Sequence, residues 1–423
     1  MHKRRSLKTN FLFALAGNMI YMVCQYLILM LFTKNYDSGI VGGYLFAIAF
    51  VAPIVISADM QLRSFYVTEK SPSLGFQEYQ SFRIISNTIA LLVVVITAYI
   101  LQRQLLLTII LIGGIKIIEN QVDMYYASVQ RIERMDYISI SKTIRGLITL
   151  VMVFTGIKAG LQVDTILLLW LSLWIIFLIL DANLSLKISK LGKRTGSFFK
   201  LRSLAAILKI CIPVLILLVV FQYYSNFPNY VVKGKLGLSA LAIFGSIIYF
   251  RSIGAQIINP MGAVIAPRLS DYWRTERYAD FIHLLVRTTF LALLLGLAGI
   301  VVALPFGRQI LQLVYTKEYA QHYMLLVLVM VYCVPTYLYV FLGTALTCLR
   351  VHWIKVPIHI VSFLVLAALT YWQYATLTLD RLVIYMIIAE SLTFLLYTLS
   401  FIVLYNKIKD NGFATKGIFK NIS

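Results

Sequence analysis

The stretch TILLLWLSLWIIFLIL, residues 165–180, consists of apolar side chains with one threonine, one serine and no charge. Because a helix rises about 1.5 Å per residue, about 20 such residues cross a hydrocarbon core that is about 30 Å thick. Residues 89–101 and 291–304 are equally free of charge. Strands of a membrane barrel would instead alternate polar and apolar side chains. These runs predict an all-α, polytopic membrane protein.

The composition of the whole chain agrees with this class. Of 423 residues, 60% are hydrophobic and 13% are charged, whereas a soluble domain has about 45–50% and about 25%. At about 20 residues per span, the sequence predicts about twelve transmembrane helices. We expect them at residues 11–33, 42–61, 83–101, 105–127, 143–160, 165–186, 204–232, 238–265, 281–304, 322–348, 354–375 and 382–405.

The distribution of basic residues predicts the orientation. The chain has 38 Lys and Arg against 17 Asp and Glu, a net charge of +21 that would suggest nucleic-acid binding in a soluble protein. Here 25 of the basic residues fall in the two tails and the connections on one side of the predicted spans, and eight fall on the other. The positive-inside rule then predicts that both termini are cytoplasmic. The bilayer, and no nucleic acid, is the expected partner of these charges.

A basic connection divides the chain in two. Residues 187–202 form the longest strongly basic connection and leave six predicted spans on each side, which predicts an N-terminal lobe of residues 1–196 and a C-terminal lobe of residues 197–423. A weak similarity between residues 32–44 and 231–244 supports two pseudo-symmetric lobes. Parallel six-helix repeats are typical of transporters, whose substrate path lies between the repeats.

The sequence lacks the motifs of several enzyme classes. It has no Gly-rich phosphate loop with a lysine and no HExxH pair. The connections are too short for the external loop in which a membrane polymerase or glycosyl ligase would place acidic or histidine side chains. We therefore expect no enzyme activity, no catalytic residues, and no metal or organic cofactor.

Charges inside predicted spans mark candidate binding residues, because a charge near the bilayer centre costs about 2.5–3.5 kcal/mol and usually faces a protein interior or a water-filled path. Arg251 lies near the midpoint of predicted span 238–265, and Asn259 follows about 80° around the helix. The five donors of a guanidinium match phosphate oxygens. Arg251 and Asn259 are therefore candidates for substrate binding, and the alternative for Arg251 is an ion pair with an acid on a neighbouring helix.

Acidic residues inside two spans are candidates for ion coupling. Lys116, Glu119 and Asp123 have spacings i, i+3 and i+7, which place them on one helix face. Lys116 is a candidate for substrate binding, and Glu119 and Asp123 could pass a coupling cation; alternatively, Lys116 and Glu119 neutralise each other. Glu390 lies centrally in the last span, where it is either the partner of Arg251 or a protonatable coupling site. The coupling ion would be H⁺ or Na⁺.

Amide side chains form a stripe on predicted span 204–232. Gln222, Asn226 and Asn229 share a face that would suit a hydroxyl-rich sugar. Pro228 interrupts this face, so the amides could equally satisfy the backbone groups that the proline frees.

Two further amides and two lysines are weaker candidates. Asn18 and Gln25 share a face of the first span and are candidates for substrate binding, although interhelical hydrogen bonding would also explain them. Lys209 and Lys355 lie nearer the predicted cytoplasmic ends, where we expect them to reach the headgroups. Lys355 could also attract an anionic headgroup.

Several short segments in order carry a resemblance to a known family. They are Asp59-Met60-Gln61-Leu62-Arg63-Ser64, Asp123-Met124-Tyr125-Tyr126, Ser225-Asn226-Phe227-Pro228-Asn229-Tyr230, Pro267-Arg268-Leu269 and Glu318-Tyr319. With them the chain resembles the polysaccharide exporters of the multidrug/oligosaccharidyl-lipid/polysaccharide (MOP) superfamily, including the Wzx-type O-antigen and capsule repeat-unit flippases. Relatives often carry arginine where this chain has Asn229, so a substrate contact made by that arginine would pass to Arg251 or be lost.

The resemblance implies a MATE-like fold of two six-helix lobes. It implies a flippase that moves a polyprenyl-diphosphate-linked oligosaccharide across the bacterial cytoplasmic membrane by alternating access. The product would be a surface polysaccharide, either the O-antigen of lipopolysaccharide or a capsule. A polysaccharide polymerase and other assembly proteins would be its partners. The alternative within the superfamily is a MATE-type multidrug/cation antiporter, which would need an acid-dominated site.

Overall fold

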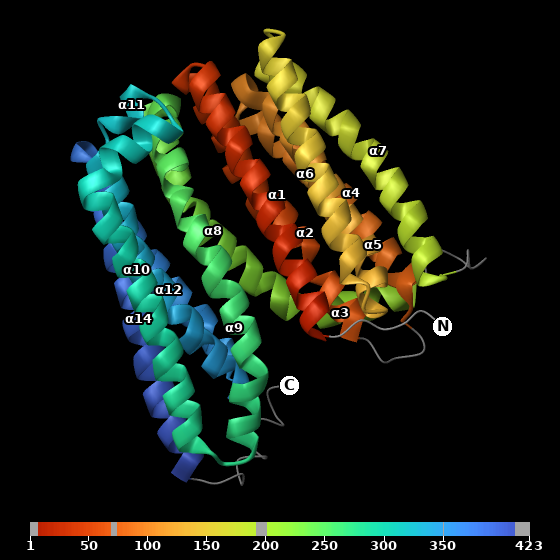
Figure 1. The fold of residues 1–423 in the computed structure, drawn as a ribbon, viewed down its shortest axis with the longest axis vertical. Coiled ribbons are helices and arrows are strands. Elements are labelled where there is room, and N and C mark those ends of the chain that lie inside the picture. The colour runs from red at the N-terminus through yellow and green to blue at the C-terminus, as the bar shows by residue number, and fades with distance from the viewer. Residues whose placement is uncertain (1–6, 69–73, 192–200, 350, 411–423) are drawn as a thin grey trace. The chain divides into compact units, whose positions relative to one another are not determined.

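The computed structural model describes residues 7–68, 74–191, 201–349 and 351–410, and within these ranges every regular element is a helix (Figure 1). No strand occurs in them, as the sequence predicts. The α-helices are α1 (Leu7–Asn35), α2 (Ser38–Asp59), α3 (Leu62–Thr68), α4 (Phe76–Leu101), α5 (Leu106–Arg131), α6 (Met135–Lys158), α7 (Val163–Ser189), α8 (Leu201–Ile248), α9 (Phe250–Arg274), α10 (Tyr278–Val314), α11 (Lys317–Ala320), α12 (Tyr323–Cys348), α13 (Lys355–Trp372) and α14 (Leu379–Asp410).

Eleven helical segments of the described chain are long and apolar enough to cross a membrane. Ten of them each match one predicted span. The eleventh, Leu201–Arg274, is 74 residues long and contains two predicted spans, 204–232 and 238–265. The prediction of a polytopic helical protein is confirmed. The two spans are joined by a break in the backbone at the expected connection and not by a loop.

The backbone break inside this long segment lies at Gly237, with φ 87° and ψ 179°. This combination is open essentially to glycine alone. A second joint follows at Tyr249, where Ser252 N donates to Tyr249 O at 2.9 Å in place of an i to i−4 bond. The predicted span 238–265 is therefore divided between α8 and α9, and Arg251 lies in the first turn of α9 rather than at the middle of one helix.

The outer surfaces of the helices are apolar. Leu101, Ile176 and Val301 are 63%, 55% and 67% exposed, and similar aliphatic residues recur along α4, α7 and α10. Such extended apolar faces would be unstable in water and are suited to lipid. The chain is therefore a multi-pass membrane protein.

The chain forms two compact units, residues 1–242 and 243–423. The boundary lies within α8, whereas the basic connection predicts a division at 196/197. The first part of α8 belongs with the N-terminal helices because Tyr230 Oη donates to Ala49 O of α2 at 2.8 Å and Lys233 Nζ donates to Gln102 Oε1 at 2.6 Å. Residues 192–200 lie outside the described residues, and the pseudo-symmetric division at 196/197 stays a prediction.

Glycines set the closest helix contacts of the first unit. A Cβ atom on Gly17 of α1 would lie 2.4 Å from Ser139 Oγ of α6, and one on Gly42 of α2 would lie 1.8 Å from Leu238 O of α8. No larger residue fits at either place without backbone movement. The contact at Gly17 brings the neighbouring Asn18 close to the polar face of α6.

In the second unit α12 is the central helix and packs against α9, α10 and α14, while α13 packs against α14. Its side chains Val329, Phe341 and Ala345 are fully buried. On the α9 side, a Cβ atom on Gly254 would lie 2.2 Å from Tyr337 Oη. Glycine at 254 thus leaves the space through which Tyr337 reaches the backbone of Arg251.

Candidate substrate-binding and coupling sites

Arg251 lies in a chain of polar contacts within the second unit. Its Nη1 donates to Tyr332 Oη of α12 at 3.3 Å, and Tyr332 Oη donates to Glu390 Oε1 of α14 at 3.4 Å. Tyr337 Oη donates to the carbonyl oxygen of Arg251 at 2.8 Å, which fixes the first turn of α9. The guanidinium is half-buried, and Tyr332 and Glu390 are 6% and 3% exposed.

The contact of Arg251 is thus a neutral hydroxyl, with the carboxylate of Glu390 one step further. Glu390 is thus linked to Arg251 indirectly, through Tyr332, and its role as a coupling site stays a prediction. The two contacts are long for hydrogen bonds to charged groups. A stronger acceptor, such as a phosphate oxygen, would therefore compete well for the guanidinium.

The first unit holds a second cluster of charges, on α1, α3, α5 and α6. Lys116 Nζ lies 2.8 Å from Glu119 Oε2, and Tyr21 Oη donates to Glu119 Oε1 at 3.2 Å. The side chains of Lys116 and Glu119 are 41% and 32% exposed. The pair is the mutual neutralisation that the sequence left open as an alternative, and it is exposed enough to rearrange around an anion.

Two cations that the sequence did not single out complete this cluster. Arg63 of α3 forms an ion pair with Asp123 at 2.5 Å and donates to Gln130 Oε1 at 2.6 Å. Lys142 of α6 donates to Asn18 Oδ1 at 2.9 Å. Lys142 lies one residue before predicted span 143–160, whereas α6 begins at Met135 and includes it.

The predicted amides are only partly brought together. Asn226 Nδ2 donates to Gln222 O at 2.9 Å and to Gln222 Oε1 at 3.4 Å, so these two amides contact each other on α8. Asn229 is half-buried on the same helix. Gln25 Nε2 is buried and has no hydrogen-bond partner within the described ranges, and Gln25 does not join Asn18 at the contact with Lys142.

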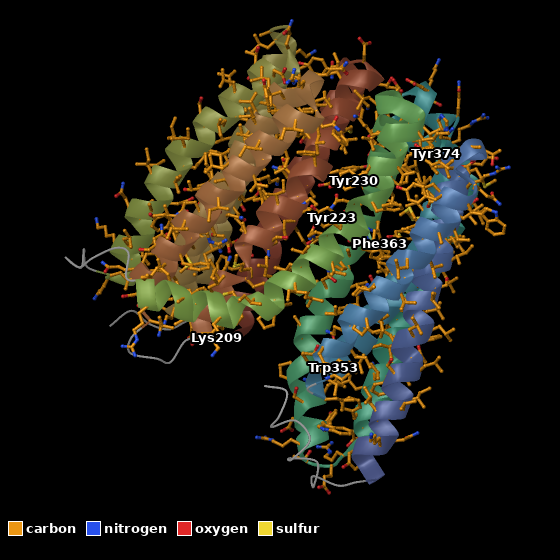
Figure 2. All side chains as sticks on the ribbon, turned by 180° about the vertical axis from the view of Figure 1, so that it is seen from behind. Lys209, Tyr223, Tyr230, Trp353, Phe363 and Tyr374 are labelled. Atoms are coloured by element: carbon orange, nitrogen blue, oxygen red, sulfur yellow. The ribbon has the colours of Figure 1, made fainter. Side chains whose placement is uncertain are left out.

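Asn259 and Lys209 lie at exposed positions. Asn259 is exposed on α9, just over two turns beyond Arg251, and no described hydrogen bond joins the two residues. Lys209 is exposed on α8, and its side chain points away from the neighbouring helices (Figure 2). Lys209 is therefore a suitable control for substitutions of the buried cations.

A buried ion pair in the first unit was missed at the sequence level. Arg145 of α6 pairs with Asp181 of α7, and each residue is 3% exposed. Asp181 also accepts hydrogen bonds from Ser141 Oγ at 2.7 Å and Tyr137 Oη at 2.8 Å, and the guanidinium lies 4.6 Å from the centroid of the Trp174 ring. With these partners, the pair is suited to joining α6 and α7 rather than to binding a ligand.

The signal for this pair is present in the sequence. Asp181 is an acid inside predicted span 165–186, and the rule that ranks Arg251 applies to it equally. Arg145 lies two residues inside predicted span 143–160, where it counts as an end residue, whereas α6 begins at Met135 and places it well inside the helix.

Comparisons with known proteins agree with the resemblance seen in the sequence. No protein-family model matches the chain. The capsular polysaccharide biosynthesis protein CapF of Staphylococcus aureus is 25% identical over 338 residues, which are 80% of this chain and 84% of that protein.

Solved structures have the same fold. An inward-facing MATE-family multidrug resistance transporter of the MOP superfamily matches with a TM-score of 0.74 at 13% identity, over 93% of this chain and 99% of that one. The lipid II flippase MurJ, in an inward closed conformation, matches with a TM-score of 0.68 at 14% identity, over 92% and 87%. The chain is therefore similar over most of its length to a capsule biosynthesis protein and has the fold of the MOP-superfamily transporters.

Proposed function

We propose that this protein is a flippase that moves a polyprenyl-diphosphate-linked oligosaccharide across the bacterial cytoplasmic membrane for the synthesis of a surface polysaccharide. The observation that carries the proposal is Arg251, a guanidinium inside an apolar helical bundle whose side-chain contact is a hydroxyl. Its charge is available to an anionic substrate. The similarity to a capsule biosynthesis protein and a fold shared with a lipid II flippase support the same conclusion.

The chemistry of the substrate fits the residues of both units. A diphosphate needs cations, and each unit by itself holds candidates: Arg251 in the second unit, and Lys116, Arg63 and Lys142 in the first. The sugar needs amides, and Gln222 and Asn226 present two. The lipid tail stays in the bilayer. Transport by alternating access needs no catalytic group, and the protein would be a transporter and not an enzyme.

The proposal includes location and partners. Both termini would be cytoplasmic, since the tails and the connections on that side carry most of the basic residues. A polysaccharide polymerase and other assembly proteins would receive the translocated unit, as either an O-antigen or a capsule precursor.

The second candidate is a multidrug/cation antiporter, because the structural match to a MATE-family transporter has the higher TM-score of 0.74. A site for organic cations would be dominated by acids. Arg251 at the joint of α8 and α9 opposes such a ligand, and it favours the flippase.

Deletion of the gene tests the proposed function directly. The strain is expected to lose its surface polysaccharide and to accumulate the lipid-linked repeat unit in the cytoplasmic leaflet, and the cloned gene should reverse both effects. Lipid extracts give the total amount of the lipid-linked repeat unit. A membrane-impermeant sugar label applied to intact spheroplasts detects the part that has reached the outer leaflet. Normal polysaccharide together with sensitivity to cationic dyes would favour the antiporter instead.

For ion coupling, we propose that Glu390 or Asp123 exchanges or binds the driving cation, H⁺ or Na⁺. Glu390 is 3% exposed, and Asp123 is paired with Arg63. Neutralising either carboxylate, as Glu390→Gln or Asp123→Asn, is expected to reduce the dependence of transport on one ion gradient. Transport assayed in vesicles with imposed proton or sodium gradients checks this. Equal responses of both variants and the wild type to each gradient contradict coupling at these residues.

A further inference from the structure

A pocket of about 380 Å³ lies within the second unit, between α9, α12, α13 and α14, and is distinct from the contacts of Arg251. The space is left open by small residues in the lining, among them Gly262 and Ala266 of α9 and Gly343 of α12. Pockets for small ligands begin at about 300 Å³. The volume therefore suits a lipid headgroup and is too small for an oligosaccharide repeat unit.

The charged side chain in the lining of the pocket is positive. Lys355, the first residue of α13, is the one ionisable cation that lines it, and no Asp or Glu is among the described residues of its lining. Lys355 Nζ donates to Thr347 Oγ1 at 2.7 Å. An ammonium carries three N–H groups, so two remain for a ligand. A half-buried cation without a facing carboxylate favours an anion.

The remaining polar lining suits phosphate. Tyr339 and Tyr397 line the pocket with aromatic rings whose centroids lie 5.4 Å apart, and Tyr397 Oη is held 3.2 Å from His359 Nε2. Ser270 adds a hydroxyl. A compact ammonium with hydroxyl donors is a common arrangement for binding phosphate oxygens as a point charge.

The position of the pocket along the bundle indicates a lipid as the source of the phosphate. Lys355 and Thr347 lie at the facing ends of α13 and α12, and Trp353 between them is 50% exposed (Figure 2). Exposed tryptophan is enriched at the level of the headgroups. A headgroup at this depth would reach Lys355 while its tails remain in the bilayer.

We propose that this pocket binds the phosphate headgroup of a membrane lipid, with Lys355 as the cation that holds it. The lipid is either a bilayer phospholipid or a polyprenyl diphosphate. The proposal concerns binding alone and does not depend on the proposed transport function.

Native mass spectrometry of the full-length protein in detergent tests it with three probes: phosphatidylglycerol, polyprenyl diphosphate, and diacylglycerol as the lipid without phosphate. Lys355→Met is expected to weaken binding of at least one phosphate lipid about tenfold, as the loss of a charged hydrogen bond implies. Lys355→Arg should retain most of the affinity, and Lys209→Met should retain all of it. Diacylglycerol should bind wild type and Lys355→Met equally.

A second variant leaves the charge in place. Ala263 lines the pocket at an exposed position, so the larger side chain of Ala263→Phe can enter the pocket without disturbing the buried core. Ala263→Phe should weaken the binding of the same phosphate lipid that Lys355→Met affects. If the variants bind phosphatidylglycerol more weakly than wild type does, the site belongs to a phospholipid. If they bind polyprenyl diphosphate alone more weakly, the site belongs to polyprenyl diphosphate. Affinities that are equal in wild type, Lys355→Met and Ala263→Phe for both phosphate lipids overturn the proposal, whatever the deletion strain shows about transport.

Discussion

Arg251→Ala is expected to abolish most polymer export while the protein remains inserted and folded. The loss of a charged donor to a phosphate should reduce transport about tenfold to a hundredfold. Folding should survive because, among the residues that the structure describes, the hydrogen bond of the guanidinium is the long one to Tyr332, 3.3 Å. In addition, Tyr337 bonds the backbone carbonyl, which alanine keeps. Surface polysaccharide measured in the complemented deletion strain, at matched protein level, checks the result.

Three further variants test whether the loss of export comes from the charge of Arg251. Arg251→Lys keeps the charge and should recover part of the export, while Lys209→Ala, at an exposed position on α8, should change little. Tyr332→Phe removes the hydroxyl that joins Arg251 to Glu390 and should leave export closer to wild type than Arg251→Ala does. Equal export by wild type and Arg251→Ala would remove Arg251 from the substrate site.

Asp181→Leu is expected to destabilise the first unit strongly, by about 3–5 kcal/mol, because it leaves the guanidinium of Arg145 buried without its carboxylate. Both residues are 3% exposed, and the hydroxyls of Tyr137 and Ser141 also lose their acceptor. The measurement is the midpoint of thermal unfolding in detergent, together with the amount of protein inserted in the membrane.

The double variant Arg145→Met with Asp181→Leu should recover most of this loss, since it removes both charges and fills the space with apolar atoms. The exposed pair of Arg274 and Asp271, 2.9 Å apart with side chains 78% and 52% exposed, provides a contrast. Asp271→Leu should change stability by less than about 1 kcal/mol. A destabilisation of Asp181→Leu no larger than that of Asp271→Leu would contradict the structural role of the buried pair.

The helices were predictable because hydrophobic length alone determines a membrane span. Residues 165–180 specify α7 without any knowledge of its neighbours. Predicted span 143–160 begins late because charge lowers the hydropathy of residues 134–145, although α6 begins at Met135 and buries Arg145 against Asp181. The break at Gly237 lies in the connection between predicted spans 204–232 and 238–265, so the sequence anticipates it. The joint of α8 and α9 at Tyr249 falls inside predicted span 238–265, and a tyrosine gives no sign of a helix end there.

Within the candidate sites, only contacts between residues of the same helix could be predicted from the sequence. Spacing on one face correctly anticipated the pairing of Lys116 with Glu119, which are neighbours on α5. It could not supply Tyr332, which lies 81 positions from Arg251 in the sequence, or Arg63, which lies on α3 and pairs with Asp123 of α5. Such partners are determined by how helices pack, and a pattern read along one helix does not contain that information.

The glycine at 237 also has a practical consequence for mapping topology with reporters. Its φ of 87° and ψ of 179° join two helical stretches directly, so an epitope inserted there would force apart a continuous segment of 74 residues. Gly160, by contrast, is exposed and lies in the turn between α6 and α7, also at positive φ, 72°. A tag at Gly160 should therefore be tolerated, and antibody access to it in intact cells would report which side of the bilayer that turn occupies.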